Sequence, residues 1–449
     1  MEMPNFLEMP KTKLEIISRK TIKPSSSTPQ HLQTFQLSFW DKPIPVPPEY
    51  GTIIFFYQTN DCQNDDDETL SMFLQRSNTL QKSLSQTLTH YYPLAGRLKD
   101  DATAVDCFDE GAYFVVARID CQLSTLLNHP DADFLSHFCP ALDTNNVPSG
   151  CMLAIQLTLF NCGGIAITVS PSHKLVDASS LCTFVQSWTS LNTAREGSSK
   201  VVTPIPIFLE PHSKPPSVLL NMPKLTGIPG DFVRRRFVVP ASKIAQLRTK
   251  TTGSSTPSGQ QYLSDSDLVL ALIMKSAILA SRSLSESSSG SYVLFQLVNM
   301  RKRVRPPLPA STIGNIALYY TTKIEENQIE LNELAGKFRK SLIEFCNLPD
   351  NSIPNEEPKF SIKGSPYCCT NLCGFPLYEI DFGWGKPSWV TSTVLQFRNI
   401  IVLQKTKEGD SIEVWISMDE REMAVFEQDH DIIAYASNDP SVLAAYSRM

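Results

Sequence analysis

The chain has 449 residues, of which 42% are hydrophobic, and a formal net charge of −6 at pH 7. This length predicts two or three domains rather than one core, and the apolar content is typical of a globular chain and excludes a disordered one. The acidic balance argues against a general nucleic-acid-binding protein, which would carry an excess of basic residues.

The eleven cysteines are scattered along the chain without the spacing of a disulfide framework. Cys368, Cys369 and Cys373 cluster, but no second group of Cys or His follows at zinc-site spacing. We therefore expect buried or free thiols and no bound metal. Because the sequence has no N-terminal basic-plus-apolar signal segment and no run of about 18 apolar residues, we expect a cytoplasmic protein with no membrane partner.

The first hundred residues predict two strands and a helix. Apolar residues at 14–17 indicate the first strand, and the run at 51–57 indicates a buried one. Residues 69–90 predict a helix, and the acidic run 64–68 before it is expected to be a solvated loop. We interpret Tyr91–Leu98, which contains Pro93 and Gly96, as structural. The apolar face of the helix consists of Leu80, Leu84 and Leu88.

A hairpin followed by a helix is predicted in the middle of the first half. Two apolar, partly β-branched segments at 151–160 and 165–169 flank a Gly-Gly turn. His173 follows them directly and stands at a strand-to-helix junction, where a side chain is held firmly at the edge of a sheet. The helix face is indicated by the spacing of Leu181, Phe184, Val185 and Trp188.

His173 and Asp177 stand four positions apart at this junction. Alone, this spacing is a weak signal, because about one chain in three with seven histidines would contain it by chance. A lone histidine beside a hairpin is about as often a satisfied core residue as a reactive base. The spacing alone therefore leaves both interpretations open.

A proline-rich stretch separates the two halves of the chain. Prolines recur between residues 204 and 223, and proline continues neither a helix nor a central strand. We expect a linker at about 196–226, between a first domain at 1–195 and a second at 227–449.

The second half opens with three arginines, Arg234 to Arg236, that run into an apolar strand. We expect them to form a solvated strand face. Ser264 with Asp267 three positions on is a capping pattern, so a buried helix should begin there. The Ser/Gly-rich stretches 251–261 and 283–291 are expected to be mobile surface loops.

Two further strands are predicted at 292–299 and 316–323, on either side of the basic loop 301–305. Such a loop can be a nuclear signal, a solvated face or a site for anionic phosphates. The acidic balance of the chain disfavours a nucleic-acid partner, whose binding would weaken steeply with salt.

The segment Asp381-Phe382-Gly383-Trp384-Gly385 combines two glycines, two aromatic residues and an acid. The glycines permit unusual backbone geometry, the aromatic rings supply packing, and the acid can anchor a turn. A structural role is favoured by about two to one on residue type. Asp381 could still belong to the active site, and Trp384 could donate its indole N–H to an oxyanion.

Together, His173-x-x-x-Asp177 and Asp381–Gly385 resemble the plant BAHD family of acyl-CoA-dependent acyltransferases. The residues Cys162-Gly163-Gly164 and His173-Lys174 are most similar to the branch that contains vinorine synthase and salutaridinol acetyltransferase. The resemblance also covers Ile22–Ser25, Tyr91–Leu98, Val298–Arg303 and Gly314-Asn315.

This resemblance implies an α/β fold of two chloramphenicol-acetyltransferase-like domains, with mixed sheets flanked by helices and the active site in a channel between them. A segment near 381–405 would cross back to join the first domain. A monomer is expected, with acyl-CoA and a small-molecule alcohol as the partners.

The implied reaction is O-acyl transfer, most simply from acetyl-CoA to a hydroxyl of a plant alkaloid or terpenoid. Acyl-CoA would be a co-substrate, with no bound cofactor, and the residues that bind it are not identified. A longer or aromatic acyl donor, an amine acceptor and a non-catalytic binding relative remain alternatives. No Gly-x-Ser-x-Gly elbow for a covalent acyl-enzyme is present.

The resemblance also implies roles for single residues. His173 would be the general base, since an imidazole can take the proton of a poorly nucleophilic hydroxyl. Asp381 would be the second residue of the active site. Asp177 would pair with Arg301 or Arg303 and so have an architectural role, and the structural support would be completed by Gly383, Trp384 and Gly385.

Overall fold

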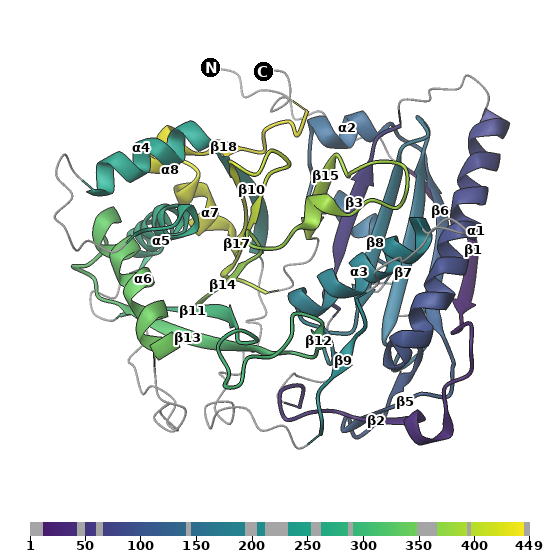
Figure 1. The fold of residues 1–449 in the computed structure, drawn as a ribbon. Coiled ribbons are helices and arrows are strands. Elements are labelled where there is room, and N and C mark those ends of the chain that lie inside the picture. Colours follow the sequence, from purple (N-terminus) through teal and green to yellow (C-terminus); the bar gives the residue numbers. More distant parts are fainter. Residues whose placement is uncertain are drawn as a thin grey trace.

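The computed structural model describes residues 12–42, 50–59, 66–140, 145–193, 204–211, 232–252, 262–285, 291–347, 366–392 and 397–443. In these residues the chain forms two large mixed β-sheets that lie side by side, each with helices packed against it (Figure 1). This arrangement confirms the predicted fold class. The predicted linker at about 196–226 lies largely outside the described residues, and the predicted domain boundaries remain a proposal.

The first sheet has six strands, and the pair β6–β7 is parallel while the other neighbours are antiparallel. Its apolar core is shared with the helices α1 (Asp66–His90), α2 (Leu123–Asn128) and α3 (Ala178–Thr193). In spatial order the strands are β1 (Leu14–Ile22), β6 (Ala112–Ile119), β7 (Leu153–Phe160), β8 (Ile165–Pro171), β3 (Ile53–Tyr57) and β15 (Trp389–Ser392).

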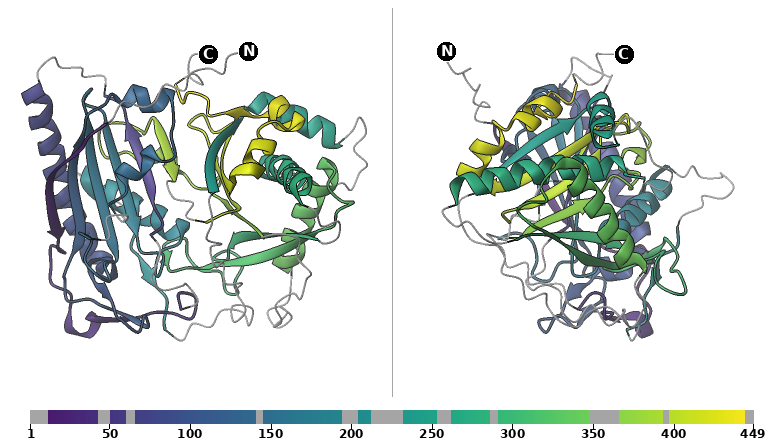
Figure 2. Two further views of the ribbon diagram at one scale, coloured as in Figure 1. Left: turned by 180° about the vertical axis from the view of Figure 1, so that it is seen from behind. Right: turned by 90° about the vertical axis from the view of Figure 1, so that its left-hand side faces the viewer.

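The second sheet has seven strands, and helices cover the side that faces away from the first sheet (Figures 1 and 2). These helices are α4 (Ala241–Thr252), α5 (Asp265–Leu284), α6 (Leu331–Asn347), α7 (Glu420–Phe426) and α8 (His430–Tyr435). The strands are β13 (Ala317–Ile324), β11 (Tyr292–Asn299), β14 (Tyr367–Asn371), β16 (Ile400–Lys405), β17 (Ile412–Asp419), β10 (Phe232–Val239) and β18 (Ser437–Asn438).

Two small sheets complete the strands of the described residues. One contains β2 (Thr34–Gln36), β5 (Ala104–Asp106) and β4 (Arg97–Leu98), and the other pairs β9 (Ile207–Phe208) with β12 (Thr312–Ile313). The second pair joins a strand from the middle of the chain to the loop that precedes β13.

The predicted hairpin and helices are confirmed by the structure. The strands β7 and β8 pair antiparallel around the glycine turn, and α3 follows them with its apolar face buried. Ser264 and Asp267 form the expected capping box at the start of α5, each side chain accepting from the other residue's backbone N–H. The loops predicted at 251–261 and 283–291 lie largely outside the described residues.

The structure corrects the prediction of a solvated loop for the acidic run before α1. The structure places Asp66, Asp67 and Glu68 in the first turn of the helix, where a loop was predicted. Carboxylates are favourable at a helix N-terminus, because the unpaired N–H groups there carry partial positive charge. Residues 66–68 of the run therefore start the helix, and residues 64 and 65 lie outside the described residues.

The prediction of a solvated strand face is wrong for Arg236, because this side chain is buried. Its Nε donates to Glu413 at 2.7 Å, and the two side chains are 3% and 2% exposed. Glu413 also accepts from the indole N–H groups of Trp389 and Trp415, both at 3.1 Å, and from Gln404 at 2.7 Å. Since Trp389 lies in β15, this cluster ties the edge of the first sheet to the second sheet.

The cysteines of the described residues are free thiols, and most are buried. Within the same residues no three His, Cys, Asp or Glu side chains are grouped as metal ligands would be. None of the described helices combines the length and the hydrophobicity of a membrane span.

Candidate active site

His173 lies between β8 and α3, at the point where the first half of the chain meets the second. The backbone before it is held by the sheet. The N–H of Gly51 donates to the carbonyl of Pro171 at 3.0 Å, and Tyr50 forms an antiparallel β-bridge with Ser172. The side chain is partly exposed, and its Nδ1 lies 3.1 Å from the Oδ1 of Asn315, which precedes β13. The predicted base therefore stands on a rigid support and contacts both halves.

Asp177 forms a buried ion pair with Arg301 across the same junction. Its Oδ2 accepts from Nη1 at 2.7 Å and its Oδ1 from Nη2 at 3.0 Å, and the side chains are 9% and 2% exposed. The backbone N–H groups of Ser180 and Ile316 also donate to it, at 2.8 and 3.1 Å. Asp177 thus points away from His173 and joins α3 to the loop before β13.

Arg303, the other arginine that could pair with Asp177, lies elsewhere. It is exposed, and it donates to the carbonyl of Asn299 at 2.7 Å and to the Sγ of Cys346 at 3.1 Å. Of the two arginines the structure brings only Arg301 to the junction, so we assign the support of the His173 loop to Arg301.

Asp381 closes a tight turn with its own neighbours. Its Oδ1 accepts from the backbone N–H of Gly383 at 2.7 Å and of Gly385 at 2.9 Å. Both glycines have positive φ, 103° and 102°, which side chains rarely adopt. The carboxylate therefore satisfies the two amides that this backbone shape leaves unpaired.

The aromatic residues of this turn pack on the far end of α3. The ring of Phe382 lies 4.8 Å from that of Trp188 and stacks on Trp384 at 5.8 Å, and its carbonyl accepts from Asn192 at 2.6 Å. Since α3 rises about 1.5 Å per residue, Asn192 is about 22 Å from Asp177 along the helix. The structure does not bring Asp381 or Trp384 to His173, and it favours a structural role for both.

Because Asp381 closes a turn at the far end of α3 from His173, its replacement should affect the stability of the protein more than its turnover. Asp381→Ala should lower the free energy of unfolding by about 1–3 kcal/mol, because two charge-assisted hydrogen bonds in a partly exposed turn are lost. The folded variant should retain kcat within about threefold. Thermal unfolding and steady-state kinetics on the same preparation test this, with Asp381→Asn as a control that keeps one acceptor oxygen. A stable Asp381→Ala variant without turnover would restore the catalytic interpretation.

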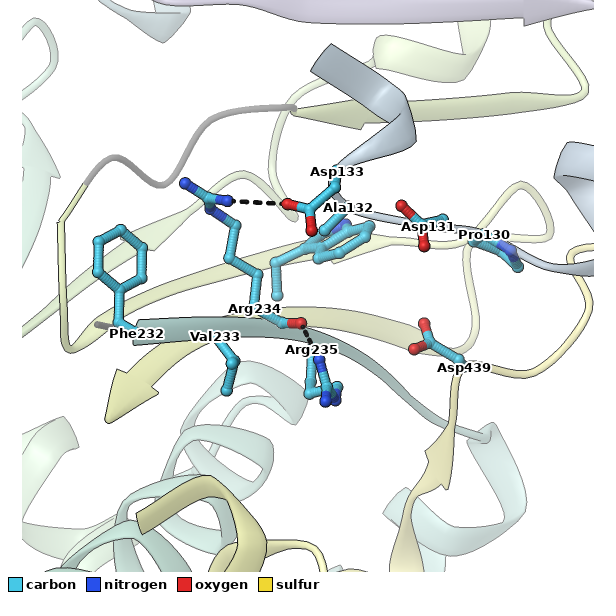
Figure 3. A pocket seen from close by; sticks show the side chains of 10 residues that line it. Pro130, Asp131, Ala132, Asp133, Phe232, Val233, Arg234, Arg235 and Asp439 are labelled. Carbon is cyan, nitrogen blue, oxygen red and sulfur yellow. Dashed lines mark hydrogen bonds and ion pairs between the residues drawn. The ribbon is translucent and has the colours of Figure 1, made fainter. Parts of the chain in front are cut away.

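A pocket of about 130 Å³ lies in another part of the molecule, between the loop 130–133 of the first half and β10 of the second (Figure 3). Arg234 reaches across it to Asp133 at 3.3 Å, while Asp439 and Asp131 line its other end (Figure 3). The residues that line this pocket include none of the predicted site residues. The predicted channel at His173 remains a prediction.

The carboxyl of Asp439, which lines this pocket, should make the stability of the folded protein depend on pH. Burial raises the pKa of its carboxyl to about 7; Arg236 and Arg235 oppose this, and Glu413 and Asp131 add to it. Its Oδ1 is buried with no hydrogen-bond partner among the described residues. Because the pKa is higher in the folded protein than in the unfolded chain, protonation of Asp439 stabilises the folded state. This stabilisation is fully present below the unfolded pKa, near 4, and is lost as the pH rises to about 7.

Asp439→Asn removes this proton linkage. We expect the melting temperature of the wild type to fall, relative to the variant, as the pH is raised from 5 to 8, by the equivalent of about 1–2 kcal/mol. Thermal unfolding of both proteins at the two pH values is the measurement. Parallel pH dependences would contradict the expectation.

No sequence pattern singles out Asp41 or gives Asn315 a role, although Gly314-Asn315 is part of the resemblance. The backbone N–H of Asn315 donates to Asp41 at 2.8 Å across a separation of 274 residues. A separation of that size leaves no local pattern that could have found the contact.

Known proteins match the chain over almost its whole length. A family model described as the Transferase family matches residues 12–432. Akuammiline synthase 1 of Alstonia scholaris is 34% identical over 434 residues, which cover 94% of this chain and 98% of that protein. Stemmadenine O-acetyltransferase of Catharanthus roseus is 33% identical over 425 residues, covering 93% and 96%.

Among solved structures, the crystal structure of vinorine synthase has the same fold. It aligns with a TM-score of 0.74 and 30% sequence identity, over 95% of this chain and 99% of that one.

Proposed function

Because the chain belongs to the Transferase family of plant BAHD acyltransferases, we propose that it transfers an acetyl group from acetyl-CoA to a hydroxyl of an alkaloid or terpenoid, with His173 as general base. The main support for this proposal is the position of His173. Its imidazole is partly exposed at the junction of the two halves, and its Nδ1 is hydrogen-bonded to Asn315. Its other nitrogen, Nε2, is then the atom that can take a proton.

The reaction needs one proton acceptor. The hydroxyl oxygen attacks the thioester carbonyl while Nε2 of His173 takes the hydroxyl proton. The tetrahedral intermediate then breaks its C–S bond, and the leaving thiolate takes the proton back from the imidazolium. The products are an ester and free CoA, and His173 is neutral again.

Three names among the relatives support the choice of substrates. The akuammiline synthase and the stemmadenine O-acetyltransferase are named for alkaloid products or acceptors, and another relative is called limonoid 1-O-acetyltransferase. Two of these names specify acetyl transfer to oxygen. Acceptor choice depends on the shape of the pocket, so the particular alcohol is left to experiment.

The experiment measures thiol release from acetyl-, malonyl-, benzoyl- and coumaroyl-CoA with a pooled set of alkaloid and terpenoid alcohols, and with matched amines. We expect acetyl-CoA to be consumed only when an alcohol is present, and mass spectrometry of the pool would identify the ester. Faster turnover of an aromatic donor, or of an amine, would replace that part of the proposal. Equal thiol release without any acceptor would indicate hydrolysis.

A further inference from the structure

Asn315 connects the proposed base to a buried carboxylate. Its side-chain Oδ1 lies 3.1 Å from Nδ1 of His173, and its Nδ2 lies 3.1 Å from Oδ1 of Asp41. The same Nδ2 donates to the backbone carbonyl of His173 at 2.9 Å. Asp41, Asn315 and His173 come from three separate segments and form one continuous chain of hydrogen bonds.

These contacts fix which way the amide of Asn315 points. Both of its N–H groups have acceptors, the Oδ1 of Asp41 and the His173 carbonyl. A carbonyl oxygen cannot donate, and the Oδ1 of Asp41 is fixed as an acceptor because it also takes the backbone N–H of Asn315. A flipped amide would set its oxygen against those two oxygens. The Oδ1 atom must therefore face His173, and because it can only accept, Nδ1 must carry the hydrogen and leave Nε2 as the free lone pair.

Asp41 is held as an acceptor by four hydrogen bonds and is 1% exposed. Its Oδ1 takes the backbone N–H of Asn315 at 2.8 Å in addition to the side-chain amide, and its Oδ2 takes the N–H and Oγ–H of Ser38 at 3.2 and 2.5 Å. Burial nonetheless raises the pKa of this carboxyl to about 6. Burying an acid costs free energy, and one charged group that offsets this cost is the buried Lys174. Its Nζ donates to the carbonyl of Lys42 at 3.0 Å, and burial lowers its pKa while the charge of Asp41 acts to raise it.

We propose that Asn315 and Asp41 are positioning residues for acyl transfer, which together hold His173 as the Nδ1–H tautomer and aim Nε2 at the acceptor hydroxyl. The inference rests on the proposed function, since it assigns the orientation of the base in that reaction. When Nε2 takes the proton, the Nδ1–H bond to Asn315 becomes charge-assisted and strengthens. The carboxylate behind it stabilises the same positive charge.

The alternative is that the network only ties the two halves together. Ser180 provides a matched control, because it ties the same two segments: its Oγ donates to the carbonyl of Gly314 at 3.0 Å and accepts from the N–H of Gly314 at 3.1 Å. It has no described contact with His173. A merely structural link should respond to Ser180→Ala as it does to a change at Asn315.

The direct test is the tautomer of His173, read from the ¹⁵N shifts of histidine-labelled full-length protein, with His173→Gln used to assign the signal. We expect the Nδ1–H form in the wild type and in Ser180→Ala. Asn315→Leu, which is similar in size but accepts no hydrogen bond, should lose it. This readout needs no turnover, so it decides the inference even if no donor or acceptor reacts and the proposed function fails.

Kinetics provide the second readout. Asn315→Leu should lower kcat by about 10- to 100-fold with the KM for acyl-CoA nearly unchanged. Because the imidazolium loses the acceptor that stabilises it, the acid limb of the profile of kcat against pH should move to lower pH. Asp41→Asn should shift that limb in the same direction with a smaller loss of kcat. A wild-type Nε2–H tautomer, or an Asn315→Leu variant no slower than Ser180→Ala with an unshifted profile, would overturn the inference.

Discussion

Replacing His173 by alanine should lower kcat by about 10²- to 10⁴-fold, the usual contribution of a general base. The KM for acyl-CoA should change little, since the imidazole acts on the acceptor hydroxyl. The backbone of the loop should keep its shape, because Ser172, Leu175 and Val176 are held by main-chain hydrogen bonds. The loss would then report chemistry and leave folding intact.

Three comparisons make this result decisive. His137→Ala removes an exposed histidine far along the chain from His173, whose Nδ1 lies 3.0 Å from the carbonyl of Phe134, and should leave kcat within about threefold. Added imidazole should partly rescue His173→Ala by supplying the missing base. Thermal unfolding should show similar melting temperatures for all three proteins. Turnover of His173→Ala at the wild-type rate would remove His173 from the mechanism.

Asp177→Ala should destabilise the protein by about 3–5 kcal/mol, the cost of leaving a buried charge without its partner. Arg301 is buried and would retain neutral acceptors among the described residues: the carbonyls of Thr312 and Gly314, the Oγ of Ser180 and the Oδ1 of Asn299. The backbone N–H groups of Ser180 and Ile316 would also lose their acceptor. We expect a low soluble yield and a lower melting temperature.

The double variant Asp177→Leu, Arg301→Met separates charge from packing. Replacing both partners of a buried pair with apolar residues often costs less than removing one. The double variant should therefore melt at a higher temperature than Asp177→Ala. A well-folded Asp177→Ala variant with an unchanged melting temperature and selectively lost turnover would show that the carboxylate acts in the reaction.

The sequence predicts elements whose signals are local. The hairpin and helix around His173, and the Ser264 cap of α5, follow from residue spacings within a few positions. The pairing of Asp177 with an arginine came from family resemblance, because spacing along a chain does not give distances across it. The structure then distinguishes Arg301 from Arg303.

The contacts that the sequence could not supply lie between distant segments. Arg236 belongs to a run that is typical of a solvated face, yet Glu413 lies opposite it from another strand. Asp381 sits in a motif of the same resemblance as His173, but the length of α3 separates the two. In both cases burial and distance depend on tertiary packing, which one sequence without an alignment does not reveal.

The position of β15 has a consequence for how the chain folds during synthesis. The strand β3 is buried along its whole length between β8 and β15, which pairs Trp389–Ser392 with Ile53–Phe56. Until β15 leaves the ribosome, β3 presents an apolar edge with unpaired backbone groups, which favours aggregation. The first sheet can therefore be completed only after residues 389–392 have been synthesised, and chains terminated before them would depend on chaperones to stay in solution.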